Sequence, residues 1–237
     1  SIAANAAFAG VMMGFCYTNL GWAPEVALVV GFAVSLLFGL ANGYLIARVG
    51  FNPMITTLST QLIIRALCYI TNAAESIEVG GDFFKALGRS KVMGILPIYV
   101  VYFLVAILVF AYVLSSTAYG RRVFAVGGNE SATYLSGVDV RRVKAVTYGL
   151  CGLLSGLAGV ANALSVSYAT PQAMNGREFE VIAAVVLGGV SLSGGKGSML
   201  GTFLGVLVMA VIGNVLILVG VQSYWQNFAQ GVILLLA

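Results

Sequence analysis

Long apolar runs recur along this chain and constrain its fold more than any other feature. The ranges 26–47, 97–117 and 143–168 contain no charged residue or a single one near an end. A helix of about 20 apolar residues matches the hydrocarbon thickness of a bilayer. Charged residues make up 8% of the 237, whereas a soluble domain carries about 25%. The sequence therefore predicts an all-α fold, a polytopic transmembrane helix bundle.

The whole chain, 1–237, is predicted to form a single transmembrane domain built on eight apolar segments. They cover approximately residues 1–17, 23–47, 53–72, 96–116, 143–167, 179–191, 199–219 and 224–237. The sixth is too short to span a core of about 30 Å and leads into a glycine-rich stretch, so we expect a short or broken helix there. Pro24, Pro53 and Pro97 lie at predicted helix starts, where the missing N–H of proline costs no hydrogen bond.

The distribution of Lys and Arg predicts how these segments are oriented. When successive loops are assigned alternately to two sides, most basic residues fall on the side that holds the loop 117–144. Most acidic residues fall on the other side. The basic side is therefore predicted to be cytoplasmic, and residues 73–95 and 168–178 are predicted to be periplasmic. This assignment requires the sixth segment to cross the membrane.

The chain contains 3 cysteines and no histidine. Cys16, Cys68 and Cys151 form no CxxC pair and lie in or near apolar segments, so we expect them to be small buried hydrophobic side chains. No metal site and no other cofactor are expected in this chain. A membrane-embedded enzyme is disfavoured, because the sequence offers no clustered carboxylates and no Cys/His or Ser/Lys constellation.

Glycines recur at three- and four-residue steps within several of the apolar segments. Lipid gives helices no hydrophobic reason to associate, so close packing depends on small residues. We expect tight helix–helix contacts along these glycines, which are Gly39 and Gly43, Gly201 and Gly205, and the series Gly149, Gly152, Gly156 and Gly159.

The longest polar cytoplasmic loop, 117–144, reads TAYGRRVFAVGGNESATYLSGVDVRRVK. Its middle predicts a short helix over 129–135, with Asn129 as N-cap, Glu130 in the positive first turn and Gly137 as C-cap. A short helix outside the membrane has little core of its own and would suit a partner protein. The alternative is a solvated loop whose arginines only fix the topology, and the residues alone leave both open.

The segment GGNESATYLSGVDV resembles the cytoplasmic loop of permeases from bacterial ABC sugar importers of the ribose/arabinose/galactose/xylose type. In that family a loop with an E-A-A…G core docks on the ATPase, and Ser131 stands here in place of the usual central alanine. The resemblance implies a set of ATPase-coupling residues, which are Gly127, Gly128, Asn129, Glu130, Ser131, Ala132, Gly137 and Arg141.

Further motifs extend this resemblance along nearly the whole chain in the right order. They are NPMITTLSTQLIIR at 52–65, YGLCGLLSGLAG at 148–159, FEVIAAVVLGGVSLSGGKGSMLG at 179–201 and NVLILVGVQSYWQ at 214–226. The first nine residues fit just after the family's D-L-S-x-G motif. Since the chain also starts without Met and ends within an apolar run, we expect it to be a fragment that lacks about two N-terminal helices of a ten-helix protein.

The glycine-rich segment 188–201 superficially resembles a nucleotide-binding loop. The pair Gly195-Lys196 is followed by Gly197 instead of Ser or Thr, and Val190 stands where a glycine is needed. ATP and Mg²⁺ are therefore expected on a separate ATPase. We expect the segment to form a tight cytoplasmic turn that allows close backbone packing, built on Gly188, Gly189, Gly194, Gly195, Lys196 and Gly197.

The segment 53–72 carries the most polar face of any predicted span. Thr57, Gln61 and Arg65 are spaced by four residues. Polar groups inside a bilayer usually face protein or a water-filled path, so one interpretation is a lining for transported substrate. The alternative is that the threonines bond back to their own helix and Arg65 extends to the interface. Asn42 and Asn214 either join such a path or form interhelical hydrogen bonds. The candidate path consists of Thr57, Thr60, Gln61, Arg65, Asn42 and Asn214.

The resemblance implies a multi-pass permease subunit in the bacterial inner membrane. It would import a monosaccharide, either a pentose, such as an arabinose-like sugar, or a hexose, by alternating access driven by the separate ATPase. The implied partners are a cytoplasmic ABC ATPase, a periplasmic sugar-binding protein and a second permease chain, as a homodimer or heterodimer, with no nucleic acid.

Two alternatives stay open for the function. The chain could be a branched-chain amino acid or nucleoside ABC permease, because these have a similar loop and glycine turn. It could also be an ion-coupled secondary transporter, but such proteins generally need buried carboxylates. All 8 acidic residues fall in loops or at helix ends, with only Glu180 borderline, which disfavours ion coupling.

Overall fold

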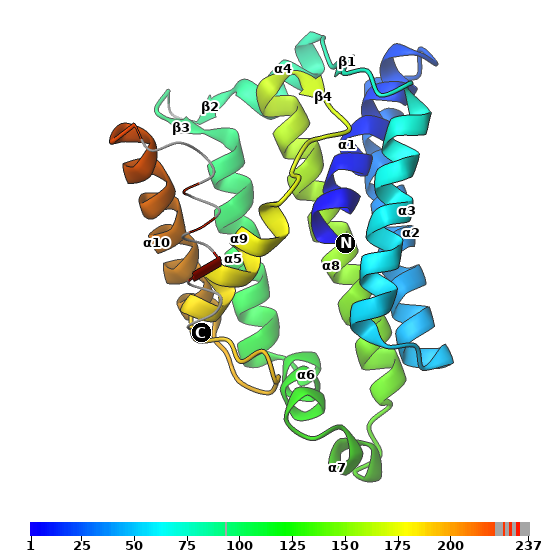
Figure 1. Ribbon diagram of the computed structural model, residues 1–237, viewed down its shortest axis with the longest axis vertical. Coiled ribbons are helices and arrows are strands. Elements are labelled where there is room, and N and C mark those ends of the chain that lie inside the picture. The colour runs from blue at the N-terminus through cyan, green and yellow to red at the C-terminus, as the bar shows by residue number, and fades with distance from the viewer. Residues whose placement is uncertain (93, 221–224, 226–227, 229–230, 233–237) are drawn as a thin grey trace. The chain divides into compact units, whose positions relative to one another are not determined.

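The computed structural model describes residues 1–92, 94–220, 225, 228 and 231–232 (Figure 1). Within the described part, five helical stretches are long and apolar enough to cross a membrane. The prediction of an all-α transmembrane bundle is confirmed, and seven of the eight predicted segments contain a helix. The eighth, 224–237, lies almost entirely outside the described residues. The chain separates into two units, one of residues 1–104 and 141–175 and one of residues 105–140 and 176–237.

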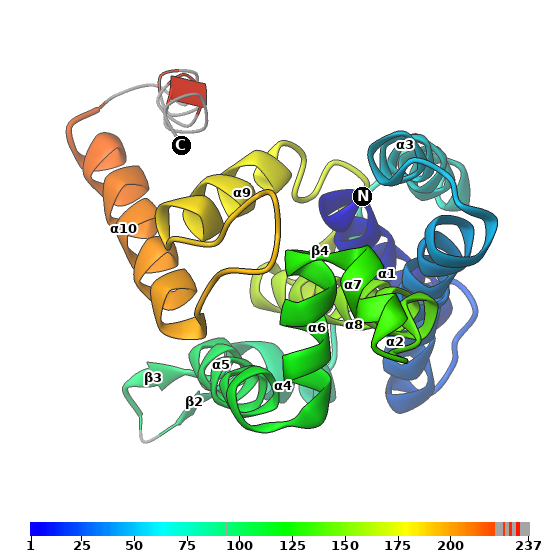
Figure 2. The same ribbon diagram turned by 90° about the horizontal axis from the view of Figure 1, so that it is seen from below.

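In the first unit, α1 (Ile2–Thr18) forms the core. It runs between α3 (Pro53–Thr71) and α8 (Val140–Val166) and also packs on α2 (Pro24–Tyr44), as Figures 1 and 2 show. Most of its residues are buried, including a series of alanines. Their short side chains let the neighbouring backbones approach closely, which is how helices associate in lipid.

The glycines predicted to pack helices together face one another between α2 and α8. A Cβ added to Gly39 would lie 2.9 Å from the Cα of Gly152, and one added to Gly43 would lie 2.9 Å from the Cα of Ala145. The Ser35 hydroxyl donates a hydrogen bond of 2.6 Å to the Gly152 carbonyl. The expected close packing is therefore confirmed for this helix pair.

Two of the three prolines predicted at helix starts occupy the first turn of a helix. Pro24 begins α2, and Pro53 begins α3 after Asn52, whose side chain accepts a hydrogen bond of 2.9 Å from the Met54 N–H. Pro97 instead ends strand β3 (Leu96–Pro97), one residue before α5 (Ile98–Ser116) begins. The far end of α2 continues as a π-helical turn, η1 (Leu45–Val49).

Loops predicted on the periplasmic side meet at one end of the first unit. Strand β1 (Ile77–Glu78) pairs antiparallel with β4 (Tyr168–Ala169). Directly after β1 in sequence come α4 (Asp82–Arg89) and the hairpin of β2 (Lys91–Val92) and β3 (Leu96–Pro97). The Thr18 hydroxyl donates a hydrogen bond of 2.9 Å to the Glu78 carbonyl, which ties α1 to this layer. These short strands and α4 were not predicted, because local pattern says little about such small elements.

The second unit contains the later part of α5, then α6 (Ala118–Gly128), α7 (Glu130–Leu135), α9 (Arg177–Leu187) and α10 (Met199–Leu218). Helix α9 has 11 residues, which rise only about 16 Å, so the expectation of a short helix is confirmed. It packs on α10 through Ala183, Ala184 and Met209.

The sequence interpretation of 117–144 as a loop with one short helix is wrong at its start. Residues 118–128 form α6, which begins after Thr117, and the Thr117 Oγ1 accepts a hydrogen bond of 3.2 Å from the Gly120 N–H. Three glycines lower the helix propensity of this segment, so its sequence reads as loop. The close contact of Gly127 with the Gly195 backbone supports the helix despite that propensity.

Candidate functional site

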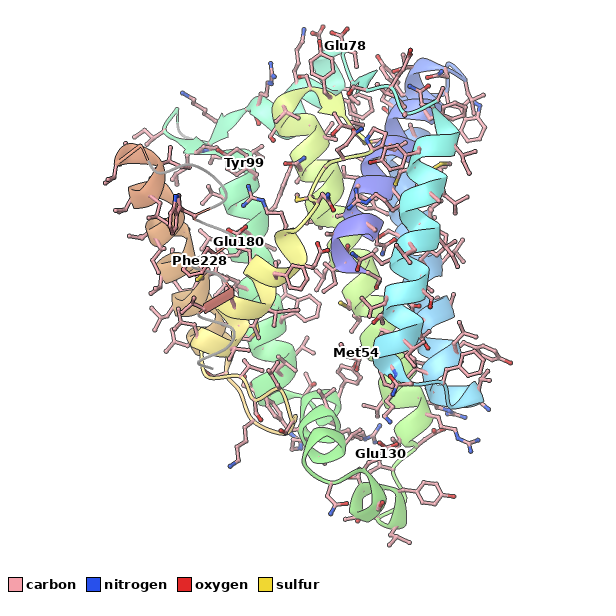
Figure 3. All side chains as sticks on the ribbon, viewed as in Figure 1. Met54, Glu78, Tyr99, Glu130, Glu180 and Phe228 are labelled. Carbon is pink, nitrogen blue, oxygen red and sulfur yellow. The ribbon has the colours of Figure 1, made fainter. Side chains whose placement is uncertain are left out.

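The centre of the predicted coupling loop is α7, on which Glu130 lies (Figure 3). The Asn129 Oδ1 accepts a hydrogen bond of 2.9 Å from the Ala132 N–H, as an N-cap does. Gly137 has a φ of +83° and its N–H donates to the Tyr134 carbonyl at 2.9 Å. The predicted short helix is therefore confirmed, with the glycine in the left-handed conformation that follows a helix end.

Helix α7 exposes nearly all its side chains. Glu130, Ser131 and Ala132 are exposed, and so is Arg141 in the first turn of α8. Only Thr133 is buried, and its hydroxyl donates back to the Asn129 carbonyl at 2.7 Å.

Two exposed apolar residues on α7 were not singled out from the sequence. Tyr134 is 70% exposed and Leu135 is 84% exposed. The signal that could have identified them is an adjacent apolar pair within the most polar loop of the chain. Exposed aromatic and aliphatic side chains next to each other form a surface that a protein partner can cover.

The glycine-rich segment between α9 and α10 forms a series of tight turns. The Ser191 N–H donates to the Lys196 carbonyl at 3.0 Å, and the Gly194 N–H donates to the Ser191 carbonyl at 3.1 Å. Gly194 and Gly195 have φ values of +89° and +73°, which residues with a Cβ rarely adopt. Ser198 ends the segment as the N-cap of α10, accepting a hydrogen bond of 3.0 Å from the Gly201 N–H.

This turn contacts the end of α6 directly. A Cβ added to Gly127 would lie 2.5 Å from the Gly195 nitrogen, and one added to Gly194 would lie 2.8 Å from the Gly127 carbonyl oxygen. At the base of the turn, Gly188 and Gly201 also pack backbone against backbone. In Figure 1 the loop after α9 reaches α6. The coupling-loop motif and the glycine-rich motif therefore form one structural feature, although they are about 60 residues apart in the sequence.

The threonines of the candidate path bond back to their own helix. The Thr57 hydroxyl donates to the Pro53 carbonyl at 2.9 Å, and the Thr60 hydroxyl donates to the Thr56 carbonyl at 3.0 Å. This is the pattern of the alternative interpretation. Each hydroxyl oxygen can still accept a hydrogen bond.

Arg65 reaches the loop after β4, which the sequence predicts to be periplasmic. Its Nη1 donates to the carbonyls of Pro171 at 2.5 Å and Ala173 at 3.0 Å. Its Nη2 is buried and has no hydrogen-bond partner among the described residues. The guanidinium therefore fixes the loop after β4 and keeps one buried donor unused.

The structure places five of the six path candidates in the first unit. Gln61 is half-buried one turn from Arg65, and its Oε1 lies 3.1 Å from the Ser1 nitrogen. Asn42 is buried on α2 and donates to the Ser1 hydroxyl at 3.4 Å, while its Oδ1 has no partner in the described chain. Asn214 is exposed on α10, in the second unit.

No group of three or more potential metal ligands occurs among the described residues. Cys16 and Cys68 are buried as expected, but Cys151 is exposed on α8. That expectation is wrong because α8 turns this side chain away from the neighbours that its glycines contact.

Comparison with known proteins gives a consistent result. The family model described as "Branched-chain amino acid transport system / permease component" matches residues 1–237. The ribose import permease protein RbsC of Escherichia coli (strain K12) is 37% identical over 219 residues, which are 90% of this chain and 67% of that protein. RbsC of Bacillus subtilis (strain 168) is 38% identical over 216 residues, again 90% and 67%. The L-arabinose transport system permease protein AraH of Escherichia coli (strain K12) is 35% identical over 237 residues, 100% of this chain and 72% of AraH. No solved structure matches the chain.

Proposed function

The chain belongs to the family of branched-chain amino acid transport system permease components, and we propose that it carries a pentose across the inner membrane. It is a multi-pass membrane transport protein, the permease of an ABC monosaccharide importer of the ribose/arabinose family. The arabinose permeases align with all of this chain and the ribose permeases with 90% of it. Both groups of relatives are named for a pentose, and this is the observation that favours a pentose as the substrate.

The substrate is tested by uptake in a strain that lacks its own pentose importers. The complete importer is supplied, and labelled L-arabinose, D-ribose, D-galactose and L-leucine are compared. We expect the two pentoses, L-arabinose and D-ribose, to accumulate faster than D-galactose and L-leucine. Accumulation of leucine and none of the sugars would support the second candidate, a branched-chain amino acid permease, which the description of the matching family favours.

We further propose that a separate ABC ATPase docks on α7. The support is the exposure of the helix together with its two apolar residues, Tyr134 and Leu135. The caps at Asn129 and Gly137 hold so short a helix in one conformation, which lowers the entropy cost of docking. ATP and Mg²⁺ are bound by that ATPase in this proposal.

The contact between Gly127 and Gly195 gives the docked ATPase a mechanical route to the membrane helices. Helix α7 follows α6 after the single residue Asn129, and the end of α6 rests on the turn that leads into α10. Close-packed backbones transmit displacement with little loss, because no flexible side chain lies between them. A movement of α7 is therefore expected to shift α10.

Docking is tested by co-purification of the ATPase with permease variants. Leu135→Ser removes an exposed apolar side chain and is expected to weaken co-purification while membrane insertion stays intact. The double variant Glu130→Arg with Arg141→Glu is expected to do the same through charge. Ile95→Ser is the matched control, because Ile95 is 81% exposed on the β2–β3 hairpin, on the side predicted to be periplasmic. Full co-purification with both test variants would refute the assignment.

Gln61 and Arg65 are proposed to line the route of the sugar. They are half-buried polar residues on a helix apolar enough to span the membrane, and such residues usually face a polar path. The unused Nη2 donor of Arg65 suits a sugar hydroxyl, which accepts hydrogen bonds. Gln61→Leu is expected to lower uptake without changing ATPase co-purification, whereas Leu62→Ala, on an exposed apolar side chain, is expected to change neither. Normal uptake by Gln61→Leu would remove α3 from the route.

A periplasmic sugar-binding protein and a second permease chain complete the proposed importer. The family resemblance supports both, since the relatives are permeases of import systems. The mass of the detergent-solubilised importer checks the number of permease chains.

A further inference from the structure

A cavity of about 570 Å³ lies in the first unit, apart from the coupling helix and the candidate sugar route. Its walls come from the end of α4, from the β2–β3 hairpin, from the first turn of α5 and from the later turns of α8. This size is within the usual range for small-molecule sites. The lining residues are Gly88, Arg89, Lys91, Pro97, Tyr99, Ala161, Asn162 and Ser165.

Two cations in this lining have no acidic partner. The Arg89 Nε donates to the Ser165 carbonyl at 3.1 Å, which holds the guanidinium against α8. Neither Arg89 nor Lys91 forms an ion pair with any described residue. Lys85, one turn before Arg89 on α4, differs because its Nζ lies 3.6 Å from the Asp82 carboxylate. The cavity is therefore a local concentration of uncompensated positive charge.

Neutral hydrogen-bonding groups accompany the charges. The side-chain amide of Asn162 and the hydroxyl of Tyr99 line the cavity, and neither has a hydrogen-bond partner in the part of the chain that the structure describes. Both groups can donate to an anionic oxygen. Two cations with nearby neutral donors are the set that binds a phosphate group.

The cavity lies where two membrane-spanning helices end. Tyr99 is in the first turn of α5 (Figure 3), and Ser165 is in the last turn of α8. Both helices are long and apolar enough to cross a bilayer, so their ends mark the headgroup level. Tyrosine is common at that level.

The hairpin beside the cavity has an apolar tip. Ile95 is 81% exposed and Leu96 is also exposed, although both lie outside the spanning helices. Phe83, on helix α4, is also an exposed apolar residue. Exposed apolar residues next to uncompensated cations fit a lipid surface better than water, because the apolar groups enter the acyl region while the cations meet the phosphates.

We infer that this cavity binds the phosphate of an anionic phospholipid. Arg89 and Lys91 supply the charge, Asn162 and Tyr99 supply hydrogen bonds, and the hairpin tip anchors in the neighbouring lipid. The bound headgroup joins α4, the hairpin, α5 and α8, so it stabilises the end of the first unit where these elements meet.

The test measures the affinity of the purified importer in detergent for dioctanoyl phosphatidylglycerol. Dioctanoyl phosphatidylcholine and sodium phosphate are titrated in parallel. We expect phosphatidylglycerol to bind more tightly than either, and Arg89→Gln and Lys91→Gln each to weaken it about fivefold. Lys85→Gln is the matched control, since it removes a cation that is already paired with Asp82, and it is expected to leave the affinity unchanged.

Equal binding of phosphatidylcholine would overturn the proposal, because it would show no use of the two cations. Equal binding of sodium phosphate would reassign the cavity to a free anion. Variants that keep their lipid affinity but lose capture of the sugar-binding protein would assign Arg89 and Lys91 to an acidic protein surface instead. Lipid selectivity of the unmutated importer decides the question even if a variant fails to fold.

Discussion

Gly127, at the end of α6, packs directly on the backbone of Gly195, so closely that an added Cβ would lie 2.5 Å from the Gly195 nitrogen. Its neighbour Gly128 has open space where its Cβ would be. The two adjacent glycines thus differ sharply in what they tolerate. This difference allows the contact between α6 and the glycine-rich turn to be tested by single substitutions.

Gly127→Ala is expected to separate α6 from the turn and to lower the free energy of unfolding of this region by about 1–3 kcal/mol, as overpacking does. The thermal unfolding midpoint and ATP-driven uptake are both expected to fall. Gly128→Ala is the matched control and is expected to leave both unchanged. Equal effects of the two substitutions would show that the contact does not couple α6 to the turn.

Asn129→Ala removes the N-cap of α7 and is expected to destabilise that helix by about 1 kcal/mol. ATPase co-purification should weaken, because docking must then also order the helix. Asn129→Asp keeps an oxygen that accepts from the Ala132 N–H, so it should retain the wild-type level. If the Ala variant binds the ATPase as well as the Asp variant does, the cap has no part in docking.

Gly137→Ala is expected to cost about 1–2 kcal/mol, because the φ of +83° strains a residue that has a Cβ. No neighbouring atom lies within 4 Å of an added Cβ, so the cost comes from the backbone and not from a clash. Gly137→Asn is the informative comparison, since asparagine tolerates this conformation. We expect ATPase co-purification to fall with Gly137→Ala and to recover with Gly137→Asn. A larger loss with Asn than with Ala would show an effect of side-chain size and would contradict the backbone explanation.

Gly39→Ala is expected to push α2 away from α8, because its Cβ would lie 2.6 Å from the Tyr148 carbonyl oxygen. The expected loss is about 1–3 kcal/mol, measured as a lower unfolding midpoint in detergent. Gly213→Ala, within α10, meets no atom within 4 Å and should not lower the midpoint. A stable Gly39→Ala variant would mean that the packing of α2 on α8 relaxes easily.

Features that depend on local pattern could be predicted from the sequence. The spanning helices follow from apolar runs, because a bilayer forces each run to satisfy its own backbone hydrogen bonds. The short helix after Asn129 follows from its cap and from Gly137, which act within a few residues. The candidate coupling residues came from motif resemblance, and the structure places three of them, Glu130, Ser131 and Ala132, on an exposed short helix.

Features that depend on contacts between distant segments could not be predicted from the sequence. Helix α6 contains Gly120, Gly127 and Gly128, and its sequence reads as loop until the turn around Gly195 supports it. The partners of Arg65, the carbonyls of Pro171 and Ala173, lie 106 and 108 residues further along the chain, so no local pattern identifies them.

The sequence by itself therefore determined that this is a bundle of membrane helices, and it identified glycines that pack them together. Only the tertiary structure decided that Gly39 faces Gly152 and that Gly127 rests on Gly195. The physical reason is the distance along the chain over which each kind of interaction acts. Hydropathy and capping act within one turn or one span, whereas a glycine reveals its partner only when two backbones meet in space.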